Sequence, residues 1–79
     1  MENKALALMM EYQHHLERTE NWGYFYVSRH IAERYSLIEW LEFEKLFIKR
    51  ATELGYVVII ESDPASYRTK ISWERPRET

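Results

Sequence analysis

The sequence predicts an α+β fold in which three helices precede a two-stranded antiparallel β-hairpin. Two patterns carry this prediction. Apolar residues recur with helical spacing over residues 3–18 and 37–54. Residues 56–73 are instead rich in β-branched residues and end in a stretch where apolar and polar residues alternate, as in a strand. The glycines, at 23 and 55, and the prolines, at 64 and 76, break the chain between the predicted elements.

Length and composition limit the class of protein. The chain of 79 residues allows one domain, so we treat residues 1–79 as a single small α+β domain. It contains no cysteine, which excludes disulfides and thiolate metal clusters and agrees with a cytoplasmic protein. No apolar run reaches the ~18–20 residues of a membrane-spanning helix, and no signal peptide is recognisable. So small a core gains stability from a protein partner or a second copy.

The first helix is predicted over residues 3–18, where one stripe is apolar: Ala5, Leu8, Met9, Tyr12 and Leu16. Residues 24–35 allow two interpretations. If these residues form a helix, its apolar and charged residues separate onto two sides, with Tyr24, Val27 and Ile31 on the apolar side. The opening "YFYV" instead favours a short strand at 24–28. We favour the helix, in which Tyr26 alone of the aromatic residues lies on the polar side.

Ser36 begins the next helix. Ser36 and Glu39 have the spacing of a capping box, and Gly55 suits the residue after the C-terminus, so the helix is predicted over 37–54. Helical spacing predicts one broad core-facing arc: Leu37, Trp40, Leu41, Phe43, Phe47, Ile48, Ala51 and Leu54. Glu44 lies within this arc, whereas Ile38 and Leu46 lie among the charged residues of the opposite arc.

Residues 56–73 are predicted to form the hairpin. "YVVIIES" is rich in β-branched residues, and "DPAS" is typical of a turn. Strict alternation in "YRTKISW" predicts a core face of Tyr67, Thr69, Ile71 and Trp73 and a solvent face of Arg68, Lys70 and Ser72.

The sequence carries no recognisable catalytic motif, and we predict no catalytic, cofactor-binding or metal-binding residue and no small-molecule substrate. His14 and His15 are adjacent, which on a helix turns their rings apart rather than toward one metal ion. Glu44 has two interpretations. It is either a carboxylate held in an apolar setting as an acid, or a surface residue that pairs with a nearby cation, and we favour the second.

The order of three helices and a hairpin, with "SRHIAERYSLIEW" as a helix-turn-helix, resembles the winged-helix family over residues 3–73. The resemblance implies that helix 37–54 is the recognition helix and that hairpin 56–73 is the wing. DNA-phosphate contacts would then come from Arg68 and Lys70. Arg75 is a further candidate, because residues 64–79 carry four basic and two acidic residues.

A protein-interaction module without enzymatic activity is the function we rank first. Ile38 and Leu46 on the charged arc, together with Tyr26, predict an exposed protein interface. Small acidic phage or mobile-element proteins that bind and inhibit a host factor have this general character. A winged-helix DNA-binding regulator ranks second, because Glu39 and Glu42 at the start of its recognition helix would repel phosphate.

Overall fold

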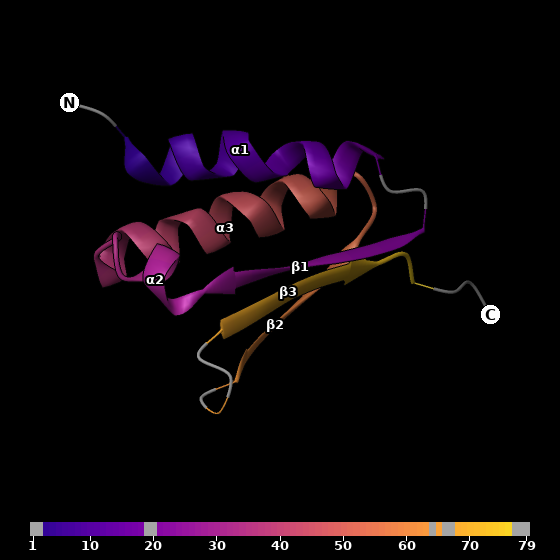
Figure 1. Ribbon diagram of the computed structural model, residues 1–79. Coiled ribbons are helices and arrows are strands. Elements are labelled where there is room, and N and C mark those ends of the chain that lie inside the picture. Colours follow the sequence, from indigo (N-terminus) through magenta and orange to yellow (C-terminus); the bar gives the residue numbers. More distant parts are fainter. Residues whose placement is uncertain (1–2, 19–20, 64, 66–67, 77–79) are drawn as a thin grey trace.

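A computed structural model of the chain describes residues 3–18, 21–63, 65 and 68–76. Its elements, in order, are α1 (Lys4–Arg18), β1 (Trp22–Ser28), α2 (Arg29–Ala32), α3 (Leu37–Glu53), β2 (Val57–Asp63) and β3 (Arg68–Glu74). The three strands form one antiparallel sheet in the order β1-β3-β2. The long helices α1 and α3 lie on one side of this sheet (Figure 1). The α+β class is confirmed, and the sheet has three strands rather than the two predicted.

The first half of the predicted helix 24–35 is wrong: these residues form β1, as the competing interpretation required. Phe25 and Val27 point into the core, while Tyr24 and Tyr26 are exposed, which is the alternation of a half-buried strand. Of the predicted helix 24–35, only the short helix α2 (Arg29–Ala32) is present. The Ser28 hydroxyl caps it by accepting a hydrogen bond from the Ile31 N–H at 3.4 Å. Pairing with β3 decides between the two patterns, because residues 22–28 lie opposite residues 68–74 in an antiparallel ladder and bury Phe25 and Val27 beneath the helices.

Helix α1 agrees with its prediction. Its apolar stripe faces α3 and the sheet, with Leu8 and Leu16 fully buried. The ring of Tyr12, half-buried on the same stripe, stacks on Phe25 of β1 with 4.4 Å between ring centroids. None of the helices in the described part of the chain is long and apolar enough to cross a membrane.

The start of α3 is fixed by the predicted capping box. The Glu39 N–H donates to the Ser36 hydroxyl at 3.1 Å, and the Ser36 N–H donates to the Glu39 carboxylate at 2.8 Å. The backbone N–H of Ser36 is the largest cause that lowers the pKa of Glu39 below its ordinary value of 4.5. The box therefore stabilises the fold above the unfolded-state pKa, and this contribution is lost as the pH falls through the lowered folded-state pKa.

The helix α3 ends at Glu53, one residue before the predicted end, and Gly55 follows it with a φ of 87° that is unfavourable for residues with a side chain.

The two strands predicted within residues 56–73 form β2 and β3, which pair antiparallel, but they belong to a three-stranded sheet and not to a separate two-stranded hairpin. Ile71 and Trp73 are buried, and Arg68, Lys70 and Ser72 lie on the opposite face of the sheet. Tyr67, predicted to share the core face, lies outside the described residues. In the turn, the Asp63 carboxylate accepts a hydrogen bond from the Ala65 N–H at 3.0 Å, as expected of a turn-forming aspartate.

The predicted core-facing arc of α3 is too wide. Phe43, Phe47 and Ala51 are fully buried. Three residues assigned to the same arc are exposed instead: Leu37, Leu41 and Ile48. Leu46, predicted to be exposed, is half-buried and packs against the core. The buried arc is rotated toward Leu46 because α1 packs along α3, and no element of the described chain covers the other flank.

Loss of the α3 cap should destabilise the fold. We expect Ser36→Ala to lower the free energy of unfolding by about 0.5–2 kcal/mol, because the Glu39 N–H loses its partner. Urea denaturation measures the difference. Ser62→Ala, at an exposed position of β2, is the matched control and should leave the transition unchanged. Equal midpoints for Ser36→Ala and the control would contradict the capping role.

Adjacent residues of β1 should respond in opposite ways to truncation. We expect Phe25→Ala to cost about 3–5 kcal/mol, because a buried ring leaves a cavity. Tyr24→Ala should cost less than about 1 kcal/mol, because that ring lies on an exposed face, where its neighbours are Trp22 and Tyr26 of the same strand and Lys70 of β3. Thermal and chemical denaturation test both. The reverse order of stabilities would mean that β1 pairs one residue out of register.

Candidate functional site

The side of the sheet that faces away from the helices is apolar where it meets solvent. We call this surface the sheet face, formed by Trp22, Tyr24, Tyr26, Val57 and Ile59 around the central strand β3. Trp22 is 64% exposed and Tyr24 is 50% exposed. The solvent side of an antiparallel sheet ordinarily carries polar residues. An exposed group of aromatic and branched side chains of this size indicates a binding surface.

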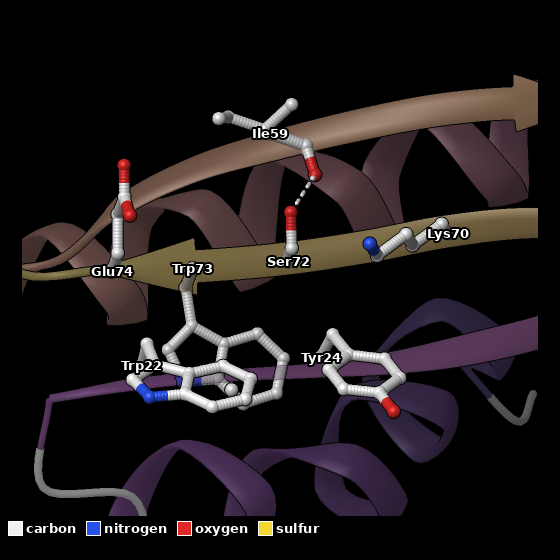
Figure 2. A pocket seen from close by; sticks show the side chains of 8 residues that line it. Trp22, Tyr24, Ile59, Lys70, Ser72, Trp73 and Glu74 are labelled. Carbon is white, nitrogen blue, oxygen red and sulfur yellow. Dashed lines mark hydrogen bonds between the residues drawn. The ribbon is translucent and has the colours of Figure 1, made fainter.

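A shallow hollow of about 220 Å³ lies in the sheet face. Ser72 of β3 forms its floor because its small side chain stands between larger ones on both neighbouring strands (Figure 2). Trp22 and Tyr24 form one wall, and their rings are parallel within 4° at a centroid distance of 6.1 Å. Ile59 of β2 forms the other wall, and its carbonyl accepts a hydrogen bond from the Ser72 hydroxyl at 3.3 Å. The hollow therefore has mainly apolar walls.

The basic side chains of the sheet face lie over aromatic rings. The Arg68 guanidinium is 3.9 Å from the ring centroid of Tyr26, and the Lys70 ammonium is 5.2 Å from that of Tyr24. Across the sheet, Lys70 is paired in register with Glu61, and Arg68 with Asp63. The positive charges are thus partly balanced by carboxylates, so this surface is not a basic patch.

A second exposed apolar surface follows helix α3. We call it the α3 face, formed by Leu37, Ile38, Leu41 and Ile48 with the charged residues Glu42, Glu44, Lys45 and Lys49. Leu37 is 73% exposed and Ile38 is 78% exposed. A groove of about 670 Å³ runs along this surface, and half-buried Leu46 contributes to its edge. Helix faces of this kind pack against another helix or sheet.

The predicted interface residues do not form one surface. Tyr26 is exposed, as predicted, but on the sheet face rather than on a helix, and it contacts Arg68. Ile38 lies on the α3 face, and Leu46 borders it. Of the candidate nucleic-acid contacts, Arg68 and Lys70 lie on the sheet face. Arg75 follows β3, with its guanidinium 5.0 Å from the Tyr56 ring centroid.

Sequence reasoning missed most of the apolar residues of each surface. On the α3 face it assigned Leu37, Leu41 and Ile48 to the core. On the sheet face it missed Trp22, Val57 and Ile59, and it assigned Tyr24 to the apolar side of a helix. The alternation of residues 22–28 was the available signal for Trp22 and Tyr24, since residues two apart on a strand share a face.

The histidines form no metal-binding arrangement. The rings of His14 and His15 do not turn apart as predicted: their centroids lie 4.3 Å apart, and His15 also stacks against Tyr12 and Phe25. Burial is the largest cause that lowers the pKa of His15 below 6.5, and the neighbouring charges of His14 and Arg18 lower it further. Across the described residues, no group of three His, Cys, Asp or Glu side chains is placed to hold a metal ion.

Comparison with known proteins adds no relative: no family model, no curated protein and no solved structure matches the chain. The function must therefore be argued from the two exposed surfaces. Both surfaces combine apolar side chains with charges of both signs.

Proposed function

We propose that the protein is a non-enzymatic protein-interaction module that binds partners through the sheet face and the α3 face. The observation that carries the proposal is the exposure of large apolar side chains on both surfaces of a chain of 79 residues. Such a chain would gain solubility from polar residues at these positions, so their apolar character needs another explanation. Burial against a partner supplies it.

The composition of the sheet face favours a protein partner. Tryptophan and tyrosine are enriched at the centres of protein interfaces, where a rigid ring buries a large area at small entropic cost. Trp22 and Tyr24 present such rings, and both line the hollow in the sheet face. Lys70 and Glu74 lie at the two ends of this hollow (Figure 2), so a partner carrying both charges would match it. A small phage or mobile-element protein that inhibits a host factor is one form such a module would take.

Photo-crosslinking from the two surfaces tests this function. A benzophenone amino acid at position 24 or 38 should give adducts of discrete mass in the producing cell. The same group at position 11, exposed on α1, should give none. The crosslinked protein, identified and purified, should bind the wild-type chain. Tyr24→Ser should weaken binding through the sheet face by about 30-fold, as expected for a hot-spot aromatic residue. Adducts no stronger at 24 and 38 than at 11 would contradict the proposal.

A winged-helix DNA-binding regulator is the second candidate. One observation favours it: Arg68 and Lys70 project from the same face of the hairpin β2–β3, which would serve as the wing. The helix α3 argues against it, because a recognition helix would present Glu42 and exposed leucines to the DNA groove. The protein-interaction function therefore ranks first.

Duplex binding separates the two candidates. We expect no sub-micromolar affinity for duplex DNA at ~0.15 M salt, because few phosphates can be neutralised. If the hairpin is a wing, Arg68→Ala and Lys70→Ala should each weaken binding for all sequences. They should also make the slope of log affinity against log salt concentration shallower by about 0.9 for each phosphate that is no longer neutralised. Lys4→Ala, at an exposed position on α1, is the matched control. Tight binding that depends on Arg68 and Lys70 would reverse the ranking.

A further inference from the structure

We propose that the hollow in the sheet face binds an arginine side chain of a partner protein, with the guanidinium against the ring of Trp22 and paired with the carboxylate of Glu74. This inference rests on the proposed function, because it states the chemistry by which one of the two surfaces recognises its partner. Three observations carry it: the arrangement of rings and cations along β1, the unpaired carboxylate of Glu74 and the size of the hollow.

Two of the three rings that β1 places on the sheet face already have a cation of this chain beside them. Arg68 lies over Tyr26 at 3.9 Å, and Lys70 lies over Tyr24 at 5.2 Å. Trp22 is the third ring, and no cation of the described chain lies over it, although it is 64% exposed. The indole ring attracts cations more strongly than the other aromatic side chains do. Trp22 therefore offers a site for a cation from outside the chain.

Glu74 supplies negative charge beside this ring. It lies directly opposite Trp22 in the β1–β3 register, so both side chains project from the same face of the sheet. Both line the same end of the hollow (Figure 2). Within the described residues, no hydrogen bond or ion pair uses the Glu74 carboxylate. The guanidinium of Arg75, the next residue, lies near the ring of Tyr56 instead.

Lys70 lies too far along β3 to neutralise Glu74. The two residues are four positions apart, which is about 13 Å between Cα atoms in a strand. Lys70 also has neighbours of its own, since it is in register with Glu61 on β2 and lies over Tyr24. The hollow is therefore positive at one end and negative at the other. A basic group that enters it is directed to the end where Trp22 lies.

The size of the hollow suits one side chain. Its volume of about 220 Å³ is below the ~300–1,000 Å³ of sites for drug-sized ligands. The walls formed by Ile59 and Tyr24 offer apolar surface to the methylene groups of an arginine. A planar guanidinium can stack on an indole ring and also donate two parallel hydrogen bonds to a carboxylate, which the ammonium group of lysine cannot do. Arginine therefore matches all parts of the site.

A nucleic acid suits this site poorly. Bases also stack on aromatic rings, but their phosphates need positive charge close by. Across the described strands, the charged residues of the sheet face are three acidic and two basic: Glu61, Asp63, Glu74, Arg68 and Lys70. Glu74 would repel a phosphate at the end of the hollow where the indole ring lies. The charge of this surface therefore favours a basic side chain over a nucleotide.

NMR titration of the isotope-labelled chain with short peptides tests the inference. The probe is an acetylated and amidated peptide of glycine and serine with one central arginine. We expect a millimolar dissociation constant, because a single side chain provides a small part of an interface. The signals of the Trp22 indole and the Ser72 amide should shift, whereas the indole signal of Trp40, on α3, should not. The same peptide with citrulline, an uncharged arginine of the same shape, should bind about tenfold more weakly.

Variants at the negative end of the hollow sharpen the test. Glu74→Gln keeps the shape of the side chain and should weaken binding of the arginine peptide by about tenfold. Glu74→Lys should reverse the preference, so that a peptide with a central glutamate binds more tightly than the arginine peptide. Trp22→Leu should weaken binding by about threefold, because the cation then has no ring to contact. Circular dichroism checks that each variant folds.

Glu61→Gln is the matched control. Glu61 is an exposed carboxylate on the same face of the sheet, in register with Lys70 and outside the residues that line the hollow. Its loss should leave the affinity for the arginine peptide unchanged. An equal loss of affinity in Glu61→Gln and Glu74→Gln would mean that the peptide responds to the overall charge of the surface, and this would overturn the inference.

Other results would overturn it as well. They are an arginine peptide that does not bind at millimolar concentration, equal affinity for the arginine, lysine and citrulline peptides, and binding that survives Glu74→Gln. The proposed function would stand in each case, because crosslinking from position 24 reports on any partner of the sheet face, whatever its chemistry. Adducts at 24 and 38 no stronger than at 11 would instead remove the proposed function, even if the arginine peptide bound.

Discussion

Phe47 lies where helix α3 meets the sheet, and its contacts hold the two layers together. Its ring packs edge-on against Phe25 of β1 and against Trp73 of β3, with centroid distances of 5.5 Å in both cases. Phe25 and Trp73 also contact each other at 5.8 Å. These three rings join the helix to both an edge strand and the central strand. The aromatic contacts then extend to α1, because Tyr12 stacks on Phe25.

The two-layer arrangement leaves surfaces uncovered. Two long helices cover one side of a three-stranded sheet, and no element of the described chain covers the other side. A chain of 79 residues has a high ratio of surface to volume, so some apolar residues remain outside the core. Scattered exposure would need no explanation. Here the residues are concentrated, with aromatic rings on one strand and leucines and isoleucines along one helix.

Local signals in the sequence predicted the elements that depend on local interactions. The capping box involves only Ser36 and Glu39, which are three residues apart, so its spacing fixed the start of α3. The alternation of apolar and polar residues over 68–73 predicted the buried and exposed sides of β3, because successive residues of a strand point to opposite faces of the sheet. Tyr26 was correctly predicted as exposed, although for the wrong element.

Long-range packing explains the failures. Residues 24–28 fit both a helix and a strand, and the choice depends on pairing with β3, whose partner residues come at least 40 positions later in the sequence. The exposure of Leu37, Leu41 and Ile48 depends on which flank of α3 receives α1, and no local pattern contains that information. Most of the apolar residues of each candidate surface were therefore missed, because each surface is defined by what the rest of the chain leaves uncovered.

The strand order β1-β3-β2 has a consequence for how the chain folds. The central strand is the last of the three to leave the ribosome, and neither earlier strand pairs with the other. Until β3 arrives, the backbone groups of β1 and β2 have no sheet partner, and the apolar side chains of β1 have no completed core to enter. Closing the β1–β3 pairing also requires a long chain segment to be ordered, which slows folding. From the time that β1 emerges until β3 becomes available, the chain therefore holds an aromatic strand without its sheet partner, and during this interval it is open to aggregation or to capture by a chaperone.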